Sequence, residues 1–507
     1  MSTTSEELAQ ARQRISAAYD PQLFNQSAHR LADLLALNLD RAQRSEGPVL
    51  PWMDPPDAIT EARASLHRAE TSPDDSSGTD CPERFAHLVT TMLERGLNLQ
   101  DPRYIGHQVP APVPLAGLFD AVGSATNQCM AIYEMGPWAT AVEQAMVREL
   151  GEAIGWAPDS FAGSATHGGS LANLTGLLTA RNVALGEAWE QGLADSAARP
   201  VLLVHADAHY SVARAAGILG LGSRNTVRVG LDRQGRMDPR RLDEALTRAH
   251  SLNQPVVAVV ACACATPTGA FDPLEEIAEA CRRHGVWLHV DAAHGGAALL
   301  SGRHRHLLAG LEQADSVVWD AHKMLFVPAL CTFILYREKS HSFDAFRQDA
   351  PYLFDPAAPG MAEYDSGVRT VECTKRATVF GLWGVWSLFG RQLFADMVDV
   401  TFALGRTFYE KLSEAEDFLP LHVPQCNIVV FRHIPATLRA APAERIGAFQ
   451  LELRRRLIES GEFYIVPSTV DGIGALRTTI INPLTTPAHL EQLLDALRRQ
   501  GQELLRG

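Results

Sequence analysis

Polar side chains that could do chemistry follow three apolar runs of the sequence, each at the point where the run ends. They are His209 after residues 201–205, Asp291 after residues 286–290, and His322 with Lys323 after residues 316–319. The apolar runs have the length and composition of buried strands. Ligands of mostly parallel sheets bind beyond the carboxyl ends of the strands, so we expect these side chains to share one site.

A lysine, a carboxylate and an imidazole in one site match the needs of an aldehyde cofactor such as pyridoxal phosphate (PLP). Such a cofactor needs a lysine amine to bind it and a carboxylate against its pyridinium nitrogen. Lys323 and Asp291 supply these groups, and His209 offers a flat ring that could stack on the cofactor. The chain has only three other lysines, which fit this role less well: Lys339, Lys375 and Lys411.

The run from Gly163 to Asn173 is typical of a glycine-rich loop that leads into a helix. Glycines let the backbone approach a phosphate, and a helix N-terminus offers free N–H groups to it. Each feature also has an ordinary structural explanation, because such loops, strand-end aspartates and lone lysines are common. Their joint placement at the ends of successive strands favours a cofactor site.

Elements able to position these groups alternate along the chain from about residue 140. Predicted strands at 201–205, 256–261, 286–290, 316–319 and 333–336 alternate with helical stretches such as 274–284. This alternation predicts an α/β fold with a mostly parallel sheet covered by helices on both faces. The last 115 or so residues carry a long helical stretch, strands at 428–431 and 475–481, and a final amphipathic helix.

We therefore expect three segments. Residues 1–90 form a helical arm for dimerisation, residues 91–391 a large cofactor-binding domain, and residues 392–507 a small C-terminal α+β domain. Within the arm, a helical pattern covers residues 24–39, while Pro55, Pro56 and the run 72–79 indicate loop or linker.

The chain has 507 residues, a formal net charge of −14 and eight cysteines. Such a negative charge argues against general binding to nucleic acid or to anionic membranes. The first 13 residues lack the apolar core of a signal peptide, and no uncharged run reaches the ~18–20 residues of a membrane span. The cysteines lack C-x-x-C spacing. We expect a cytoplasmic protein without disulfides.

The run from His289 to Gly296, followed by His322 and Lys323, resembles the group II PLP-dependent amino-acid decarboxylases. This family includes the glutamate, cysteine sulfinate, diaminobutyrate and aromatic amino-acid decarboxylases. The runs 269–274, 304–308, 315–317, 352–354 and 364–367 resemble the glutamate and cysteine sulfinate branch. The resemblance covers the chain from about residue 101 to its end.

The resemblance implies a fold-type-I PLP enzyme with a seven-stranded type of sheet, active as a homodimer with shared sites. It implies PLP as the cofactor and no metal.

The resemblance also implies roles for individual residues. Lys323 would be the cofactor-binding lysine and Asp291 the partner of the pyridinium nitrogen. His209 would be the ring that stacks on PLP and helps to place the substrate. It also implies that Gly169, Ser170 and His322 surround the phosphate and that Ala293 and Thr266 line the cofactor pocket. Tyr352 would be the proton donor to Cα. Arg477 would receive the substrate's side-chain carboxylate.

Three departures from the family pattern occur in this chain. Where the family usually has Asn-Pro, this chain has Asp320-Ala321, and where the family has Gly-Thr-Thr, it has Cys264-Ala265-Thr266. His167 replaces a small polar residue or proline. Ala265 removes a hydroxyl near the cofactor, and Asp320 adds a negative charge near the phosphate or the lysine. We expect these changes to affect efficiency and substrate choice more than cofactor binding.

The sequence favours an α-decarboxylase of an L-amino acid that releases CO2 and a primary amine. Arg477 and the branch resemblance favour glutamate, aspartate or cysteine sulfinate as substrate, with diaminobutyrate or an aromatic amino acid as alternatives. A second hypothesis keeps PLP but makes an aldehyde by oxidative deamination or acts as a transaminase; Tyr352 favours the amine. A third is a PLP-binding protein without turnover. The PLP signature does not determine the substrate.

Overall fold

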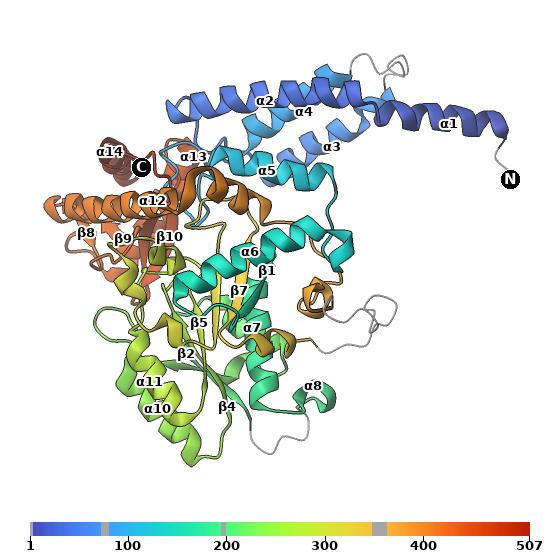
Figure 1. Cartoon of the computed structure of the whole chain (residues 1–507). Helices are drawn as coiled ribbons and strands as arrows, with labels where there is room; N and C mark the ends of the chain where they lie inside the picture. Colours follow the sequence, from blue (N-terminus) through green and yellow to red (C-terminus); the bar gives the residue numbers. More distant parts are fainter. Residues whose placement is uncertain (1–3, 72–80, 194–198, 347–361, 507) are drawn as a thin grey trace. The chain divides into compact units, whose positions relative to one another are not determined.

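The computed structural model describes residues 4–71, 81–193, 199–346 and 362–506 and contains two compact units (Figure 1). One unit comprises Met1–Ile105, Ala448–Ile465 and Leu484–Gly507. The other comprises Gly106–Gly447 and Val466–Pro483, and it carries both β-sheets. The three segments expected from the sequence stay a prediction.

A seven-stranded sheet with the order β1-β7-β6-β5-β4-β2-β3 forms the centre of the second unit. Its strands are β1 (Ala162–Thr166), β2 (Val201–His205), β3 (Thr226–Val229), β4 (Val256–Cys262), β5 (Trp287–Asp291), β6 (Ser316–Asp320) and β7 (Thr332–Tyr336). The pairs from β3 to β6 are parallel, whereas β7 runs antiparallel to both of its neighbours. The prediction of a mostly parallel α/β sheet is thereby confirmed.

Helices cover both faces of this sheet, as the nearly complete burial of its central strands requires. The helices of this unit are α5 (Pro114–Ala125), α6 (Pro137–Ile154), α7 (Gly169–Ala184), α8 (Ala188–Gln191), α9 (Tyr210–Ile218), α10 (Pro239–Ser251), α11 (Leu274–His284) and α12 (Phe380–Glu414). Helix α7 packs across β4 to β7. It comes this close because of Gly176, where a Cβ would lie 2.7 Å from Cε1 of His289.

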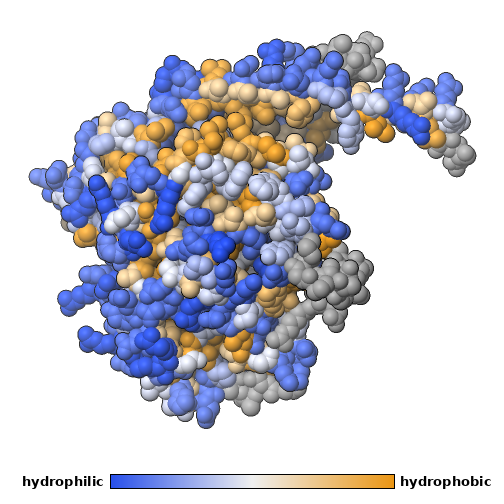
Figure 2. All heavy atoms as spheres, in the orientation of Figure 1, coloured by the Kyte–Doolittle hydropathy of each residue, from blue (hydrophilic) through white to orange (hydrophobic). Residues whose placement is uncertain are grey.

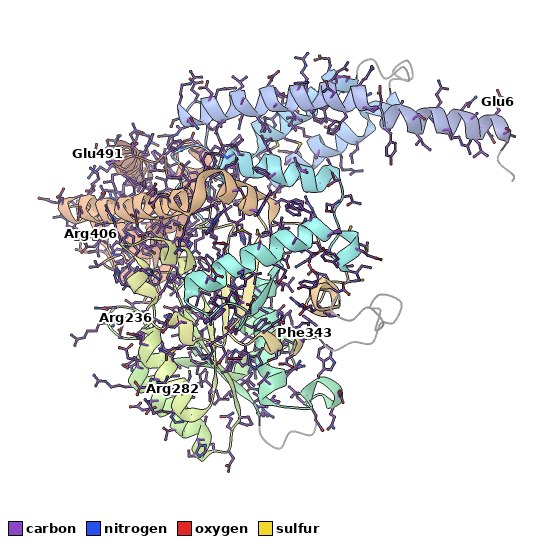
Figure 3. The ribbon with its side chains drawn as sticks, viewed as in Figure 1. Glu6, Arg236, Arg282, Phe343, Arg406 and Glu491 are labelled. Atoms are coloured by element: carbon purple, nitrogen blue, oxygen red, sulfur yellow. The ribbon has the colours of Figure 1, made fainter. Side chains whose placement is uncertain are left out.

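The two ends of α11 show how the local sequence determines where a helix begins and ends. Glu275 and Glu276 lie in its first turn, and Arg282 and Arg283 lie in its last, so the charges complement the helix dipole. Gly285 ends the helix in the left-handed conformation, with φ of 64°. The next strand, β5, starts two residues later and ends at Asp291. Arg282, labelled in Figure 3, donates to Oε1 of Gln313 at 3.2 Å.

A second, four-stranded antiparallel sheet has the order β10-β11-β9-β8. Its strands are β8 (Phe418–Pro420), β9 (Ile428–His433), β10 (Val466–Val470) and β11 (Ile473–Thr479). The expected strands at 428–431 and 475–481 correspond to β9 and β11. The expected helical stretch begins earlier than residue 392, since α12 starts at Phe380 and continues through a non-helical Gly390.

The first unit is helical. It contains α1 (Ser5–Ala18), α2 (Pro21–Gln43), α3 (Pro55–Thr71), α4 (Cys81–Arg95) and α14 (Pro487–Arg506), and α13 (Ala443–Ser460) lies mostly within it. The interpretation of Pro55 and Pro56 as loop is wrong. They begin α3, because proline at the first helical positions lacks only an N–H that a helix start leaves unpaired. The expected linker at 72–79 lies outside the described residues.

Large apolar side chains stand exposed on this helical unit, and Figure 2 shows apolar residues gathered along it. They include Phe24, Trp52, Ile59, Leu66 and Met92. Within the described residues, none of the helices combines the length and the apolar character needed to cross a membrane.

Candidate active site

A cavity of about 290 Å³ lies at the carboxyl ends of the parallel strands. Eight of the predicted site residues line it: Gly169, Ser170, His209, Thr266, Asp291, Ala293, His322 and Lys323. The structure therefore brings together groups that are 154 positions apart in the chain, from Gly169 to Lys323 (323 − 169). Tyr352 lies outside the described residues, and Arg477 is not one of the residues that line this cavity.

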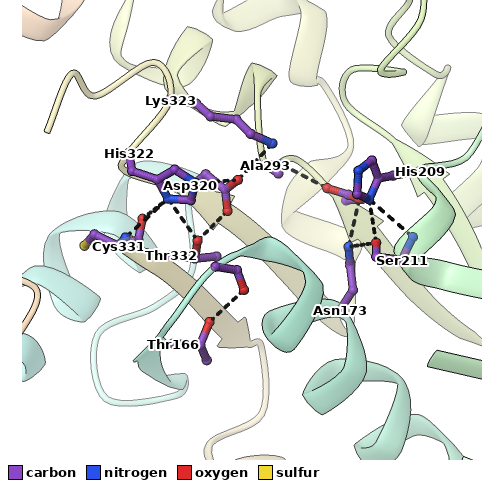
Figure 4. A network of polar contacts seen from close by, with 12 residues as sticks. Thr166, Asn173, His209, Ser211, Ala293, Asp320, His322, Lys323, Cys331 and Thr332 are labelled. Carbon is purple, nitrogen blue, oxygen red and sulfur yellow. Dashed lines mark hydrogen bonds and ion pairs between the residues drawn. The ribbon is translucent and has the colours of Figure 1, made fainter. Parts of the chain in front are cut away.

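Lys323 forms an ion pair with Asp320 at the end of β6 (Figure 4). Its Nζ lies 2.8 Å from Oδ2 of Asp320, and the lysine side chain is 22% exposed while the aspartate is 1% exposed. Burial alone would lower the pKa of Lys323, but Asp320 and Asp291 outweigh it and raise this pKa. The lysine amine is therefore held as an ammonium ion until a ligand enters.

Two further contacts, besides the one with Lys323, stabilise the charged form of the Asp320 carboxylate. The hydroxyl of Thr332 donates to Oδ1 at 2.6 Å, and Nε2 of His322 lies 3.6 Å from Oδ2. Burial opposes the charge, yet Lys323 and His322 lower the pKa of Asp320 overall. A Cβ added at Gly169 would lie 3.1 Å from Oδ1, so this carboxylate stands directly beside the start of α7.

We expect Asp320→Asn to strengthen PLP binding by roughly tenfold, because it removes a negative charge beside the predicted phosphate position. Losing the carboxylate also removes the main electrostatic support for the ammonium form of Lys323. The pKa of Lys323 then falls, more of the amine is neutral at a given pH, and cofactor association moves to lower pH. Absorbance titration of the PLP-free protein across pH measures both effects.

Asp315→Asn is the matched control, because Asp315 lies at the opposite end of β6 and binds Arg337 at 2.6 Å. This variant should leave PLP affinity and its pH dependence unchanged. Equal PLP affinity in Asp320→Asn and the unchanged protein would show that the carboxylate does not act on the cofactor.

Asp291 is held by two hydrogen bonds at the end of β5. Nδ2 of Asn173 donates to Oδ2 at 3.0 Å, and the backbone N–H of Ala293 donates to Oδ1 at 3.1 Å. Oδ1 of Asn173 in turn contacts Nε2 of His289 at 2.9 Å, while Nδ1 of His289 contacts the Ser316 hydroxyl. Burial lowers the pKa of His289 to about 4, so this imidazole is neutral and fixes the orientation of the amide.

His209 caps the N-terminus of α9 and shares this network. Its Nδ1 accepts the N–H of Ser211 at 3.3 Å and lies 2.8 Å from the Ser211 hydroxyl, to which Asn173 also donates. Burial lowers the pKa of His209, with Asp291 opposing the shift. Asn173 thus links the carboxylate and the imidazole that the sequence analysis singled out, although its own part was missed.

The glycine-rich run is organised differently from expectation. Residues 162–166 form β1 rather than loop, and only His167 and Gly168 connect this strand to α7. Gly163 permits the pairing, because a Cβ there would lie 2.7 Å from the backbone oxygen of Ile334. Helix α7 begins at Gly169, so its first N–H groups and Ser170 face the cavity, as an anion site requires.

These residues fit PLP. The cavity offers an amine at Lys323, a carboxylate at Asp291 that is already fixed by two donors, and a helix start at Gly169 where a Cβ would meet Asp320. His322 lines the cavity, and its Nδ1 contacts the Cys331 backbone. The one discordant group is Asp320, whose charge is balanced by Lys323.

Arg477 lies on β11, is 8% exposed, and donates from one terminal nitrogen to the Thr479 hydroxyl at 3.3 Å. Its Nε has no hydrogen-bond partner among the described residues. Burial lowers the pKa of Arg477, while Cys264 and Cys426 oppose this. Cys264 also lines the cavity, so the guanidinium lies near its wall.

The other lysines are engaged elsewhere. Nζ of Lys375 binds Glu143 at 2.8 Å and the Ala165 carbonyl at 2.7 Å, fully buried, and Lys339 pairs with Glu363 at the surface. Lys323 is the lysine that lines the described cavity.

Known proteins resemble this chain in sequence and in fold. Residues 90–434 match the pyridoxal-dependent decarboxylase conserved domain. The acidic amino acid decarboxylase GADL1 of mouse is 32% identical over 76% of this chain and 70% of its own length, and that of human is 30% identical over 83% and 82%. The crystal structure of mouse CSAD superposes with a TM-score of 0.85 at 28% identity, over 95% of this chain and 99% of that one. The fold is that of fold-type-I PLP decarboxylases.

Proposed function

Because this chain belongs to the family of pyridoxal-dependent decarboxylases, it is a PLP-dependent carboxy-lyase of an amino acid, and we propose that its substrate is acidic. PLP, when bound, supplies an electron sink for the pair left behind when CO2 departs. The chain's own residues bind the cofactor, orient the substrate and move protons.

In this proposal, each cavity residue has one task. Lys323 binds the cofactor and afterwards takes and returns a proton at Nζ. Asp291 would hold a proton on the pyridinium nitrogen, and Asn173 keeps this carboxylate in position. The His209 ring would stack on the cofactor, while Gly169, Ser170 and His322 would hold the phosphate. Thr266 and Ala293 complete the walls. Tyr352, which lies outside the described residues, would deliver a proton to Cα.

The unpaired buried guanidinium of Arg477 carries the proposal of an acidic substrate. A buried cation without an anionic partner is costly, so such a group points to a ligand with negative charge. Among the described residues, no carboxylate acts on the pKa of Arg477, and its Nε has no hydrogen-bond partner. The terminal carboxylate or sulfinate of a substrate side chain would fill this role. The relatives named acidic amino acid decarboxylase support the same choice.

A panel assay of the PLP-loaded protein tests the proposal. Glutamate, aspartate, cysteine sulfinate, diaminobutyrate and an aromatic amino acid are supplied separately, and CO2, amine, aldehyde, H2O2 and keto acid are followed. We expect CO2 and amine in equal amounts from an acidic substrate. Turnover of diaminobutyrate or of an aromatic substrate alone would contradict the assignment of Arg477, and aldehyde with H2O2 or keto acid would contradict the amine-forming reaction.

We expect Arg477→Gln to lower kcat/KM for the acidic substrate by roughly 10–100-fold, because a hydrogen bond to a charged group is worth about 1.5–3 kcal/mol. The loss should fall mainly on KM, since the contact is far from the reacting carboxylate. Arg477→Lys keeps the charge and should recover part of the loss. Equal effects on substrates with and without a side-chain carboxylate would show that Arg477 has a structural role only.

The proposal includes a homodimer in the cytoplasm. The exposed apolar side chains of the helical unit support an interface with a second copy, because monomers rarely expose large apolar patches. The eight cysteines are all free thiols, which supports a reducing compartment.

A further inference from the structure

Two cysteines and a histidine form a buried cluster beside the cavity. A ring nitrogen of His294 and the sulfur atoms of Cys264 and Cys426 all lie within 4.8 Å of one another. The two Sγ atoms are 4.0 Å apart, and all three side chains are buried. The residues come from three separate segments: the bend after β4, the turn after β5, and the bend just before β9.

The hydrogen bonds of Asn427 fix the tautomer of His294. Nδ2 of Asn427 donates to the carbonyl of Ile480 at 3.1 Å, so its Oδ1 is the atom that faces His294. That oxygen lies 2.9 Å from Nε2 of His294, which must therefore carry the hydrogen. Nδ1 is left with a free lone pair and has no partner among the described residues, although the side chain is only 2% exposed.

This arrangement has the features of a metal site. Histidine ligands commonly donate their second N–H to an amide or carboxylate, which orients the ring and keeps the other nitrogen free. A tetrahedral zinc ion with Zn–S bonds of about 2.3 Å would place two thiolates roughly 3.8 Å apart, close to the observed separation. Burial keeps the imidazole neutral, with the pKa of His294 lowered to about 3.

Charge and ligand type select the ion. Two thiolates and a neutral imidazole suit a soft or borderline cation and reject Mg²⁺ or Ca²⁺. Two thiolates also neutralise Zn²⁺, so the filled site would add no net charge beside Lys323 and Arg477, both of which act electrostatically on His294. Cys264 and His294 line the cavity, so the fourth position would open toward it.

We propose that Cys264, His294 and Cys426 form a binding site for Zn²⁺, with Nδ1 as the histidine ligand and an open fourth position on the cavity side. The family resemblance implied no metal, and the three residues lie far apart in the sequence, with 162 positions separating Cys264 from Cys426. Binding releases the two thiol protons to solvent as the Zn–S bonds form. A zinc ion there would hinder substrate binding, because Cys264 and His294 line the cavity.

Equilibrium dialysis of the full-length protein against Zn²⁺, with and without PLP, tests the site directly. We expect one Zn²⁺ per chain above the background of exposed thiols, and a loss of affinity of at least about 100-fold in Cys264→Ala/Cys426→Ala. The single variants Cys264→Ser and Cys426→Ser keep the side-chain volume and should show the same direction. Cys281→Ala is the control, because Cys281 is equally buried but lies on α11.

Substrate kinetics give a second readout. In the PLP-loaded enzyme we expect Zn²⁺ to inhibit competitively with the substrate, and a chelator to restore activity. The double variant should resist this inhibition, whereas Cys281→Ala should not. The proposal is overturned if the unchanged protein binds no more Zn²⁺ than the folded double variant. The dialysis does not depend on turnover, so a failure of the proposed decarboxylation would leave this result interpretable.

Discussion

Replacement of Lys323 by alanine is expected to abolish the visible absorbance of bound PLP and to lower kcat by at least about 10³-fold. The reason is that Lys323 supplies the amine that lines the cavity, while Lys375 is buried against Glu143 and Lys339 lies at the surface. No described lysine can take its place without a large rearrangement. Absorbance of the dialysed protein and a CO2 assay measure the two effects.

A folding control is needed because Lys323→Ala leaves the Asp320 carboxylate buried without its cation. Uncompensated buried charges are strongly destabilising. The double variant Lys323→Ala/Asp320→Asn removes both charges and should unfold at a higher temperature than the single variant while remaining inactive. Lys339→Ala should retain both absorbance and turnover. Survival of the absorbance band in folded Lys323→Ala would show that another group binds the cofactor.

Replacement of Asp291 by asparagine is expected to lower kcat by about 10²–10³-fold while PLP still binds through Lys323. The charge that would hold a proton on the pyridinium nitrogen is lost. In addition, both oxygens of Asp291 accept hydrogen bonds, one from Asn173 and one from Ala293, so an amide NH2 would face a donor. Steady-state kinetics of the PLP-loaded variant measure the loss.

Asn173→Ala is the graded comparison for this result. It keeps the Asp291 charge but removes one of the two hydrogen bonds that orient it, so it should lose less activity than Asp291→Asn. PLP should remain bound in both variants. Full activity in a PLP-loaded Asp291→Asn enzyme would remove Asp291 from the reaction.

Much of the large sheet could be predicted from sequence because its strands are continuous apolar runs. The run 201–205 is β2, as predicted. The helix predicted at 274–284 is α11, and the charged residues at its ends and Gly285 mark in the sequence where it begins and ends. Strand β1 was missed because Gly163, Ser164 and Thr166 resemble a loop, and only the fold supplies the close partner at Ile334 that makes glycine necessary.

The cavity residues were found where a strand ends, since that position is visible in the sequence. Asn173 was missed as a functional residue because its role arises from contacts 118 and 38 positions away, with Asp291 and Ser211. The charge of Asp320 was expected near the phosphate or the lysine, but the ion pair with Lys323, its burial and the approach of Gly169 depend on the fold. Cys426 comes close to Cys264 only because the segment before β9 of the second sheet packs beside the bend after β4.

The buried pair of Lys375 and Glu143 has a consequence for how this chain could diverge. Each side chain is 2% exposed, so losing either one would leave the other as an uncompensated charge, at a cost of about 3–5 kcal/mol. Replacing both with apolar residues of similar volume would cost little. Intermediate sequences with one of the two are therefore disfavoured by selection, and positions 143 and 375 are expected to be inherited as a unit.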